Sequence, residues 1–426
     1  MTSPLTTLPI MLEPDPTRTM VRPFSFGYPQ GFEDGRPDRG LVVAKRVLAL
    51  PREEAHDITR QLLALLDERH RNMENVLRQR YSELDPDVRA LPADDRQQLL
   101  LAATFSEEYA FESAALFNPS IVEDLDREAS DGDTPFFLSL RGIGEGHISS
   151  ITFRTGIWRA NGEVEVEEAS AQAVPPRVIK TIDGGGAELQ SGDSQTLSET
   201  VIFPVLPSQR QGVEDLRMVR FTADDGTQEL VGTYTAFDGH DARTELLRGI
   251  DFRTVELRPL GGKMAAYKGM ALFPRCIEGK YVMLGRMDSE RLWLLRSDDL
   301  LEWNEGVPIL EPKYPWEWVQ MGNCGSPVEI DEGWLVMTHG VAFMRGYSMG
   351  ACLLDRDDPS KVLARTPEPL LAPLSHGRGG YVPNVVYGCG LLVRGREMLV
   401  PYAVGDRTTT FATGRVDDVL AAMVPA

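Results

Sequence analysis

From residue 117 onward the chain is a long series of short apolar segments with the composition of β-strands. They are rich in β-branched and aromatic residues, and turn-forming residues separate them at fairly even intervals. The clearest segments are TPFFLSLRGIG, HISSITFRTG, LVGTYTAFDG, YVMLGRMD, RLWLLRSD, GWLVMTHGV and SMGACLLDRD. Because no long helical pattern interrupts the series, the spacing favours an all-β architecture over a parallel α/β sheet.

A weak internal repeat suggests how these strands are arranged. GIDFRTVEL and SDDLLEWNE each place an aspartate four residues before a large apolar residue, and the two aspartates, Asp251 and Asp299, lie 48 residues apart. A four-stranded propeller blade takes about 40–50 residues. Once a polar, glycine-rich excursion at 160–212 is set aside, the remaining length suits five blades. We therefore expect a five-bladed β-propeller, with a pair of β-sandwiches as the alternative.

The first part of the chain has a different character. Residues 1–49 are rich in proline, glycine and charge, and they predict an extended arm that includes a short strand, LVVAKRVLAL. Residues 50–116 then place Ile58, Leu62 and Leu65 at helical spacing, and a second helical pattern, DDRQQLLLAATFSEEYAFESAAL, follows. The predicted organisation is an arm at 1–49, an N-terminal α-helical extension at 50–116 and a propeller domain at 117–426.

Charge and composition exclude several classes of protein. The net charge is −20 with a pI near 4.8, and such a field repels nucleic acid and anionic membranes. No apolar run is long enough to span a bilayer, and the first residues lack the pattern of a signal peptide, so we expect a cytoplasmic protein. The four cysteines form no CxxC pair, which favours buried free thiols over a zinc site. We expect no metal and no organic cofactor.

Polar residues at the ends of several predicted strands are candidates for a site on the propeller axis, where such ends converge. They combine one acid, Asp215, with a group of basic side chains and a histidine: Arg141, Arg217, Lys268, Arg286 and His339. Basic residues gathered in so acidic a chain predict an anion site for phosphate or a carboxylate. A carboxylic acid beside a phosphate-sized basic pocket suits glycosyl transfer to phosphate.

Several ordered motifs resemble glycoside hydrolase family 130, the family of β-mannoside phosphorylases and a few β-mannosidases. These motifs are FNPSIV, VEDLR, TYTAFDG, YKGMALFP, GNCGSPVEIDEGWLVMTHGV, GACLLDRDDPSKVLARTPEPLLAP and GYVPNVVYGCG. The resemblance runs from about residue 117 to 415. It implies a five-bladed propeller, an inverting reaction that uses inorganic phosphate and yields α-mannose 1-phosphate, and, as in some members, N-terminal helices that serve in homo-oligomer formation.

The resemblance also implies roles for individual residues. Asp215 matches the catalytic acid, which in the family is thought to protonate the leaving group through a sugar hydroxyl. The expected substrate-binding residues are Asn118, Arg141, Arg217, Asp238, Gly325, Ser326, His339 and Asp406. The expected phosphate-binding residues are Lys268, Arg286, Tyr347, Arg154 and His147. The last two are included because they could compensate for family ligands that this sequence lacks.

Departures from the family pattern keep other functions open. The RNK motif of the phosphorylases reads Ala266, Tyr267 and Lys268 here, Gly285 replaces the histidine of HRP, and SSI replaces SRI. The first alternative is therefore a β-mannoside hydrolase that uses water, with Glu145 or Glu214 as its base. A more distant alternative is a propeller that binds carbohydrate without catalysis.

Overall fold

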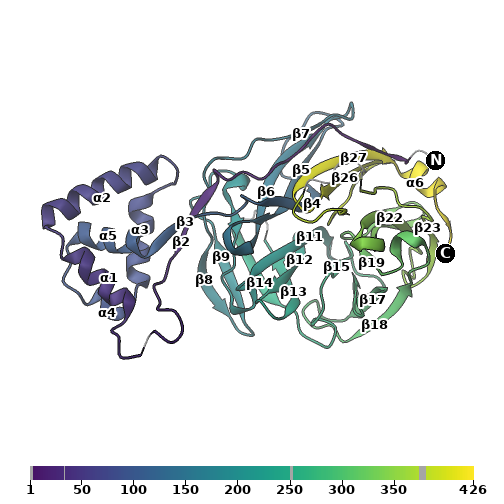
Figure 1. Cartoon of the computed structure of the whole chain (residues 1–426). Helices are drawn as coiled ribbons and strands as arrows, with labels where there is room; N and C mark the ends of the chain where they lie inside the picture. Colours follow the sequence, from purple (N-terminus) through teal and green to yellow (C-terminus); the bar gives the residue numbers. More distant parts are fainter. Residues whose placement is uncertain (1–2, 33, 250–252, 374–379) are drawn as a thin grey trace. The chain divides into compact units, whose positions relative to one another are not determined.

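The computed structural model describes residues 3–32, 34–249, 253–373 and 380–426, and in it the chain forms two compact units. The β unit comprises Met1–Pro16, Phe111–Ser170 and Pro176–Ala426, and the helical unit comprises Thr17–Ala110 and Ala171–Pro175. Strands dominate the first and helices the second (Figure 1). The expectation of a mostly β chain with N-terminal helices is confirmed.

The described part of the helical unit holds five helices and a two-stranded sheet. The helices are α1 (Arg39–Leu48), α2 (Arg52–Asp67), α3 (Met73–Glu83), α4 (Pro86–Arg89) and α5 (Asp95–Thr104). The sheet pairs β2 (Thr19–Pro23) with β3 (Ser106–Ala110) in antiparallel fashion. Leu63 of α2, Met73 and Leu77 of α3 and Leu99 of α5 pack into one core, so the apolar faces of these helices are buried against each other.

Two expectations about this region are wrong. Residues 41–48 of the segment expected as a strand at 41–50 belong to helix α1. Leu41, Ala44 and Leu48 lie on one face that packs inward, and the Asp38 side chain accepts a hydrogen bond from Leu41 N at 2.7 Å. A short apolar run of this kind does not distinguish helix from strand by itself. The second helical segment also ends at Thr104 and not near residue 116, because the chain then turns back to pair with β2.

Four sheets build the described part of the β unit. The first contains β1 (Leu5–Thr7), β24 (Val386–Tyr387), β25 (Leu392–Arg394), β26 (Glu397–Val404) and β27 (Thr408–Arg415). The largest contains β4 (Ala115–Glu123), β5 (Thr134–Ile143), β6 (Ser149–Trp158), β7 (Val164–Val166), β8 (Arg177–Ile182), β9 (Gly186–Gln190), β10 (Val201–Ile202), β11 (Gly212–Thr222), β12 (Gln228–Phe237), β13 (Ala242–Arg248) and β14 (Thr254–Pro259).

The other two sheets follow in chain order. One contains β15 (Ala271–Leu272), β16 (Tyr281–Gly285), β17 (Leu292–Ser297) and β18 (Glu305–Leu310). The other contains β19 (Gln320–Asn323), β20 (Val328–Ile330), β21 (Gly333–Val341), β22 (Tyr347–Leu354), β23 (Val362–Arg365) and β28 (Val424–Pro425), and the short helix α6 (Val416–Ala421) precedes its last strand. Within the described residues, none of the helices combines the length and the hydropathy required to cross a bilayer.

The first strand of the chain, β1, completes the sheet made by β24–β27. Leu5 to Thr7 pair antiparallel with Ala412 to Gly414, and Leu12 forms a further bridge with Thr409 (Figure 1). This part of the expected N-terminal arm is therefore held by backbone hydrogen bonds and joins the two ends of the β unit.

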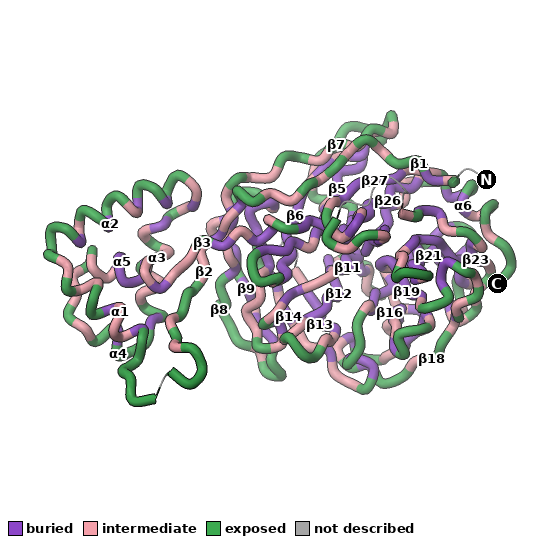
Figure 2. Tube along the Cα trace, viewed as in Figure 1, coloured by how far each residue is buried: buried purple, intermediate pink, exposed green. Residues whose placement is uncertain are grey.

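Apolar clusters join neighbouring groups of strands in a closed order. One cluster links β6 to β11–β14 through Phe153 and Met218, and the next links β11–β14 to β15–β18 through Phe221 and Met283. Two further clusters link β15–β18 to β19–β23, and β19–β23 to β24–β27. A fifth, which includes Phe411, links β24–β27 back to β4–β6. Figure 2 shows this buried interior along β5, β6, β26 and β27.

The excursion at 160–212 is more regular than its polar composition indicates. It contains β7 to β10, and β9 pairs with β14 from Ala187↔Leu257 to Gln190↔Thr254. Strand β8 forms the exposed edge of that sheet, and its apolar residues Val178 and Ile179 are 44% and 50% exposed (Figure 2). Asp251, the first aspartate of the expected repeat, lies outside the described residues. The four cysteines are free thiols, and all but Cys276 are buried.

Candidate active site

A cavity of about 140 Å³ opens where ends of strands from all four sheets of the β unit meet. Among the described residues its walls carry five basic side chains and two carboxylates. The lining residues are Phe117, Asn118, Arg141, Asp215, Arg217, Thr235, Lys268, Gly269, Arg286, Gly322, Asn323, His339, Arg345, Tyr347, Val382, Val385, Tyr387 and Asp406. In a chain with a net charge of −20 this excess of positive charge is local, and it makes the cavity attractive to anions.

Asp215 lies at a break in the pairing of β11 with β12, between Glu214 and Arg217. Its Oδ1 accepts hydrogen bonds from Asn118 Nδ2 at 2.6 Å and from Arg141 Nη1 at 3.2 Å. Burial alone would raise the pKa of Asp215, but the charges of Arg141 and Arg217 and the bond from Asn118 hold that pKa below its usual value. The carboxyl group is therefore ionised at neutral pH when the cavity is empty.

Four of the polar cavity residues have a left-handed backbone: Arg345 and three with short side chains. Asn118, Asp215 and Asp406 have φ values of 48°, 53° and 48°. Asparagine and aspartate adopt this region more readily than other residues with a side chain, but it still costs energy. Backbone strain of this kind gathers at functional sites, and here it turns three polar side chains into one cavity.

Asp406 follows β26 in the turn before β27 and differs from Asp215 in its proton affinity. Burial and the nearby charge of Asp215 raise the pKa of Asp406 to about 6, against the weaker opposing effect of Arg141 and Arg345. The cavity thus holds two carboxyl groups whose environments separate their pKa values. Such a pair can hold one proton and one negative charge at the same time.

Replacing Asp406 with asparagine tests this raised pKa. Above pH 6 the folded protein keeps a charge that is better solvated in the unfolded chain, so Asp406 lowers stability there, and this effect fades as the pH falls from about 6 towards 4. We expect Asp406→Asn to exceed the wild type in free energy of unfolding at pH 8 by up to about 3 kcal/mol, and the gain to shrink at pH 5. Urea unfolding at both pH values measures this difference in the free energy of unfolding. A gain that does not change with pH would contradict the raised pKa of Asp406.

Two arginines of the cavity already bond to other groups of the protein. Arg141 donates to Glu214 Oε1 at 2.6 Å and to Ser149 Oγ at 2.9 Å in addition to Asp215. Arg217 donates to the backbone oxygen of Asp215 at 2.9 Å and to Tyr387 Oη at 2.7 Å. These bonds fix the acid and its strand, so both guanidinium groups orient Asp215 and leave few donors for a ligand.

His339 is neutral and orients a third arginine. Burial and the charges of Arg286 and Arg217 lower the pKa of His339 well below its usual value. Its Nδ1 lies 3.1 Å from the backbone oxygen of Asn323, an acceptor, so Nδ1 carries the hydrogen and Nε2 faces Arg286 Nη1 at 3.4 Å as an acceptor. A Cβ on Gly322 would lie 2.6 Å from the His339 ring, so this position must be glycine for the histidine to fit.

The remaining two basic residues are not held in this way. Lys268, in the loop between β14 and β15, and Arg345, in the turn between β21 and β22, form no ion pair or side-chain hydrogen bond with the described residues. Both are exposed on the cavity side of the protein surface. Their donors are the ones that a bound anion can use without breaking an existing contact.

Most of the expected site residues line this cavity, but five do not. Arg154 is buried and forms an ion pair with Glu112 at 2.8 Å, and exposed His147 bonds through Nδ1 to Tyr381 Oη at 2.7 Å. Asp238 accepts bonds from the backbone nitrogens of His240 and Asp241 and so caps a turn. Gly325 and Ser326 also lie outside the lining. Neither of the expected hydrolase bases, Glu145 and Glu214, is in it.

Gly325 serves a different purpose from the one expected. Gly325 is among the expected substrate-binding residues, but a Cβ at this position would lie 2.3 Å from the backbone oxygen of Cys389. Its φ of 112° is also one that other residues rarely adopt. Glycine at this position therefore makes room for the protein's own backbone.

Sequence reasoning missed Arg345, Asn323 and Tyr387 as cavity residues. Arg345 could have been noticed as a fourth arginine beside an apolar strand end, in the stretch VAFMRGY shortly after His339. Tyr387 lies in the motif GYVPNVVYGCG, but no local pattern indicates its partner Arg217, which lies 170 residues earlier in the chain. The apolar lining residues Phe117, Val382 and Val385 look like ordinary core positions in the sequence.

The family model and the curated relatives that match this chain all describe mannoside phosphorylases. A family model described as beta-1,4-mannooligosaccharide phosphorylase matches residues 179–424. The chain is 40% identical over 154 residues to the 1,2-beta-oligomannan phosphorylase of Thermoanaerobacter sp. (strain X514), and this match covers 36% of the chain and only about half, 52%, of that relative. It is also 34% identical over 223 residues to the beta-1,2-mannobiose phosphorylase of the same organism, covering 50% and 70% of the two chains.

A solved structure has the same fold. The beta-1,2-mannobiose phosphorylase from Listeria innocua, in complex with beta-1,2-mannobiose, superposes with a TM-score of 0.52 at 21% identity. The superposition covers 74% of this chain and 92% of that one.

Proposed function

Since the chain belongs to glycoside hydrolase family 130, we propose that it is a phosphorylase that cleaves β-linked manno-oligosaccharides with inorganic phosphate. The observation that carries this proposal is the strongly basic cavity around Asp215 in an otherwise acidic chain. A hydrolase needs only water beside its carboxylates, whereas phosphate needs fixed positive charge where it attacks.

The reaction that we propose inverts the configuration of the mannosyl unit. A phosphate oxygen attacks the anomeric carbon from the face opposite the glycosidic oxygen, the old carbon–oxygen bond breaks, and the leaving oxygen receives one proton. The products are α-mannose 1-phosphate and an oligosaccharide one unit shorter. Incoming phosphate brings negative charge close to Asp215 and Asp406 and raises both of their pKa values, which loads the proton that Asp215 passes on through a sugar hydroxyl.

Lys268 and Arg345 are the residues that we assign to phosphate. Their donors are unengaged, whereas Arg286 is held by His339 and serves as a fixed positive charge near the same place. Tyr347, which stacks on His339 with ring centres 6.0 Å apart, completes this side of the cavity. Arg154 and His147 have no part in this assignment, because each is tied to a partner outside the lining.

A five-bladed propeller is the architecture that we propose for the β unit. The largest sheet counts as two blades, since β6 and β11 are joined only by the pair Ser149↔Gly212. The closed order of the five apolar clusters and the pairing of β1 with β27 support this arrangement. The cavity then lies on the axis, where the blades converge.

The proposed reaction needs no cofactor. Phosphate is a co-substrate, and neither a metal nor an organic cofactor takes part in the proposed chemistry.

We also propose a cytoplasmic enzyme that associates with copies of itself through the helical unit. Ile58 and Leu65 support this, because they are 38% and 50% exposed and lie seven residues apart on one face of α2.

Cleavage of β-linked mannobioses and mannotetraoses with and without inorganic phosphate tests the function. Mannose 1-phosphate that forms only in the presence of phosphate is the expected result. Free mannose at a rate independent of phosphate would make the protein a hydrolase, and Asp406 would then be the second carboxylate, since it lines the cavity and Glu145 and Glu214 do not. Binding of mannosides without any cleavage would leave the non-catalytic alternative.

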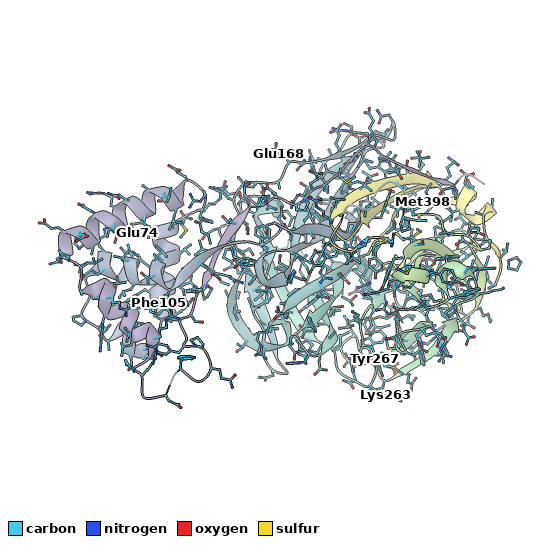
Figure 3. The ribbon with its side chains drawn as sticks, viewed as in Figure 1. Glu74, Phe105, Glu168, Lys263, Tyr267 and Met398 are labelled. Carbon is cyan, nitrogen blue, oxygen red and sulfur yellow. The ribbon has the colours of Figure 1, made fainter. Side chains whose placement is uncertain are left out.

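Removing the Lys268 side chain is expected to weaken the binding of phosphate more than the binding of the sugar. We expect Lys268→Ala to raise KM for phosphate by about tenfold or more, because one charge-assisted contact is lost, and to change KM for the mannoside by less than about threefold. Lys263→Ala is the matched control, since Lys263 is an exposed lysine of the same loop outside the cavity (Figure 3). Equal rises in both KM values would contradict the assignment of Lys268.

A further inference from the structure

An exposed apolar patch lies on two turns of the sheet that contains His339. The side chains of this patch are exposed by 55% (Trp318), 59% (Val319), 68% (Phe343) and 88% (Met344). Exposed large apolar residues are usually scattered singly over a protein surface, whereas these four are grouped. Trp318 and Phe343 are in contact, with ring centres 5.8 Å apart and planes at 86°. These four residues are called the rim patch.

The turn that carries Trp318 is rigid. Glu317, the residue before it, is fully buried, forms an ion pair with Arg365 and accepts bonds from the backbone nitrogens of Lys313 and Tyr314 at 2.8 and 3.0 Å. Trp318 Nε1 donates to the backbone oxygen of Lys313 at 3.2 Å. The indole ring is therefore held outward by a buried anchor, so its exposure is not the result of a loose loop.

The rim patch is continuous with the cavity. Phe343 and Met344 belong to the same turn as Arg345, and Arg345 and Tyr347 both line the cavity. Met344 and Arg345 have φ values of 54° and 58°, and two successive left-handed residues with side chains are a strained arrangement. In this turn Arg345 lies on the cavity wall while Phe343 and Met344 stay exposed, so the patch lies at the cavity mouth.

We propose that the rim patch is a binding platform for the mannosyl units that remain outside the cavity when one unit is cleaved. This rests on the proposed function, and it adds a preference for oligosaccharides longer than a disaccharide. The cavity is too small for a long chain, so the leaving part of the substrate must pass its mouth. Aromatic rings there offer flat apolar faces to the C–H faces of sugar rings while sugar hydroxyls remain in water.

Binding of mannobiose and mannotetraose to the whole protein, measured by titration calorimetry without phosphate, tests the platform. We expect Trp318→Ala and Phe343→Ala each to weaken mannotetraose binding by about tenfold and to leave mannobiose binding within about twofold. Trp318→Phe should keep most of the affinity. Val307→Ala is the control, since Val307 is 51% exposed on β18 and lies outside the cavity and the patch.

The other possible results distinguish a failure of the proposed platform from a failure of the proposed phosphorylase function. Equal losses for both sugars, no loss for either, or a wild type that binds no mannotetraose would overturn the platform. A change of oligomeric state in both variants with unchanged mannotetraose binding would also overturn it and would make the patch an interface between copies. A wild type that binds mannotetraose through Trp318 but releases no mannose 1-phosphate would keep the platform and overturn the phosphorylase.

Discussion

Replacing Asp215 with asparagine is expected to reduce the rate of phosphate-dependent cleavage by about 10³-fold or more while the protein stays folded. Asparagine has the same shape and adopts the φ of 53° as readily as aspartate does, so the strained backbone is kept. What is lost is the group that can carry a proton to the leaving oxygen. The rate of mannose 1-phosphate release from a β-mannobiose, with circular dichroism to check folding, measures the effect.

A substrate with an activated leaving group separates the acid role from a general disturbance of the site. A 2,4-dinitrophenyl β-mannoside needs little protonation as it leaves, so the deficit of Asp215→Asn should be much smaller with it. Asp225→Asn is the matched control, because Asp225 is an exposed turn residue on the same hairpin and its bonds within the described residues are local ones to Thr227. A similar deficit with both substrates would remove Asp215 from the role of acid.

Replacing Arg365 with methionine is expected to cost the β unit about 3–5 kcal/mol of stability, because it leaves the Glu317 carboxylate buried without its counter-ion. Glu317 Oε2 already lacks a hydrogen-bond partner among the described residues, and its other oxygen would retain only two backbone donors. Urea unfolding followed by tryptophan fluorescence measures it. All six tryptophans belong to the β unit, so the signal reports on that unit alone.

A surface ion pair provides the control for this experiment. Lys361 pairs with Asp358 at 3.3 Å, but its side chain is 68% exposed, so Lys361→Met should change stability by no more than about 1 kcal/mol. The double variant Arg365→Met with Glu317→Leu should recover part of the loss, since it removes the unpaired buried charge. If Arg365→Met lost no more stability than Lys361→Met, the expected cost of leaving the buried Glu317 carboxylate unpaired would be wrong.

Residue pattern alone determined the large-scale organisation of this protein. Apolar segments of strand length at even spacing predicted a mostly β chain after residue 116, because alternating burial on a sheet requires such a pattern. Helical spacing from Ile58 to Leu65 predicted helices before it. Polar residues at the ends of predicted strands, among them Arg141, Asp215 and Lys268, predicted one basic site with a single acid, since the types of side chain restrict the possible chemistry.

The tertiary structure decided which of those side chains are available to a ligand. Arg154 and Arg345 look alike in the sequence, yet the first is paired with Glu112 and the second lies unpaired among the described residues on the cavity wall. The tertiary structure also sets the proton affinity of the carboxyl groups, because the pKa of Asp406 is raised by Asp215, which lies far away in the chain. Hydrogen bonds such as Arg217 to Tyr387 span 170 residues, and no local pattern records them. Composition and periodicity are local properties, whereas the charge and proton affinity of a site depend on contacts that exist only after folding.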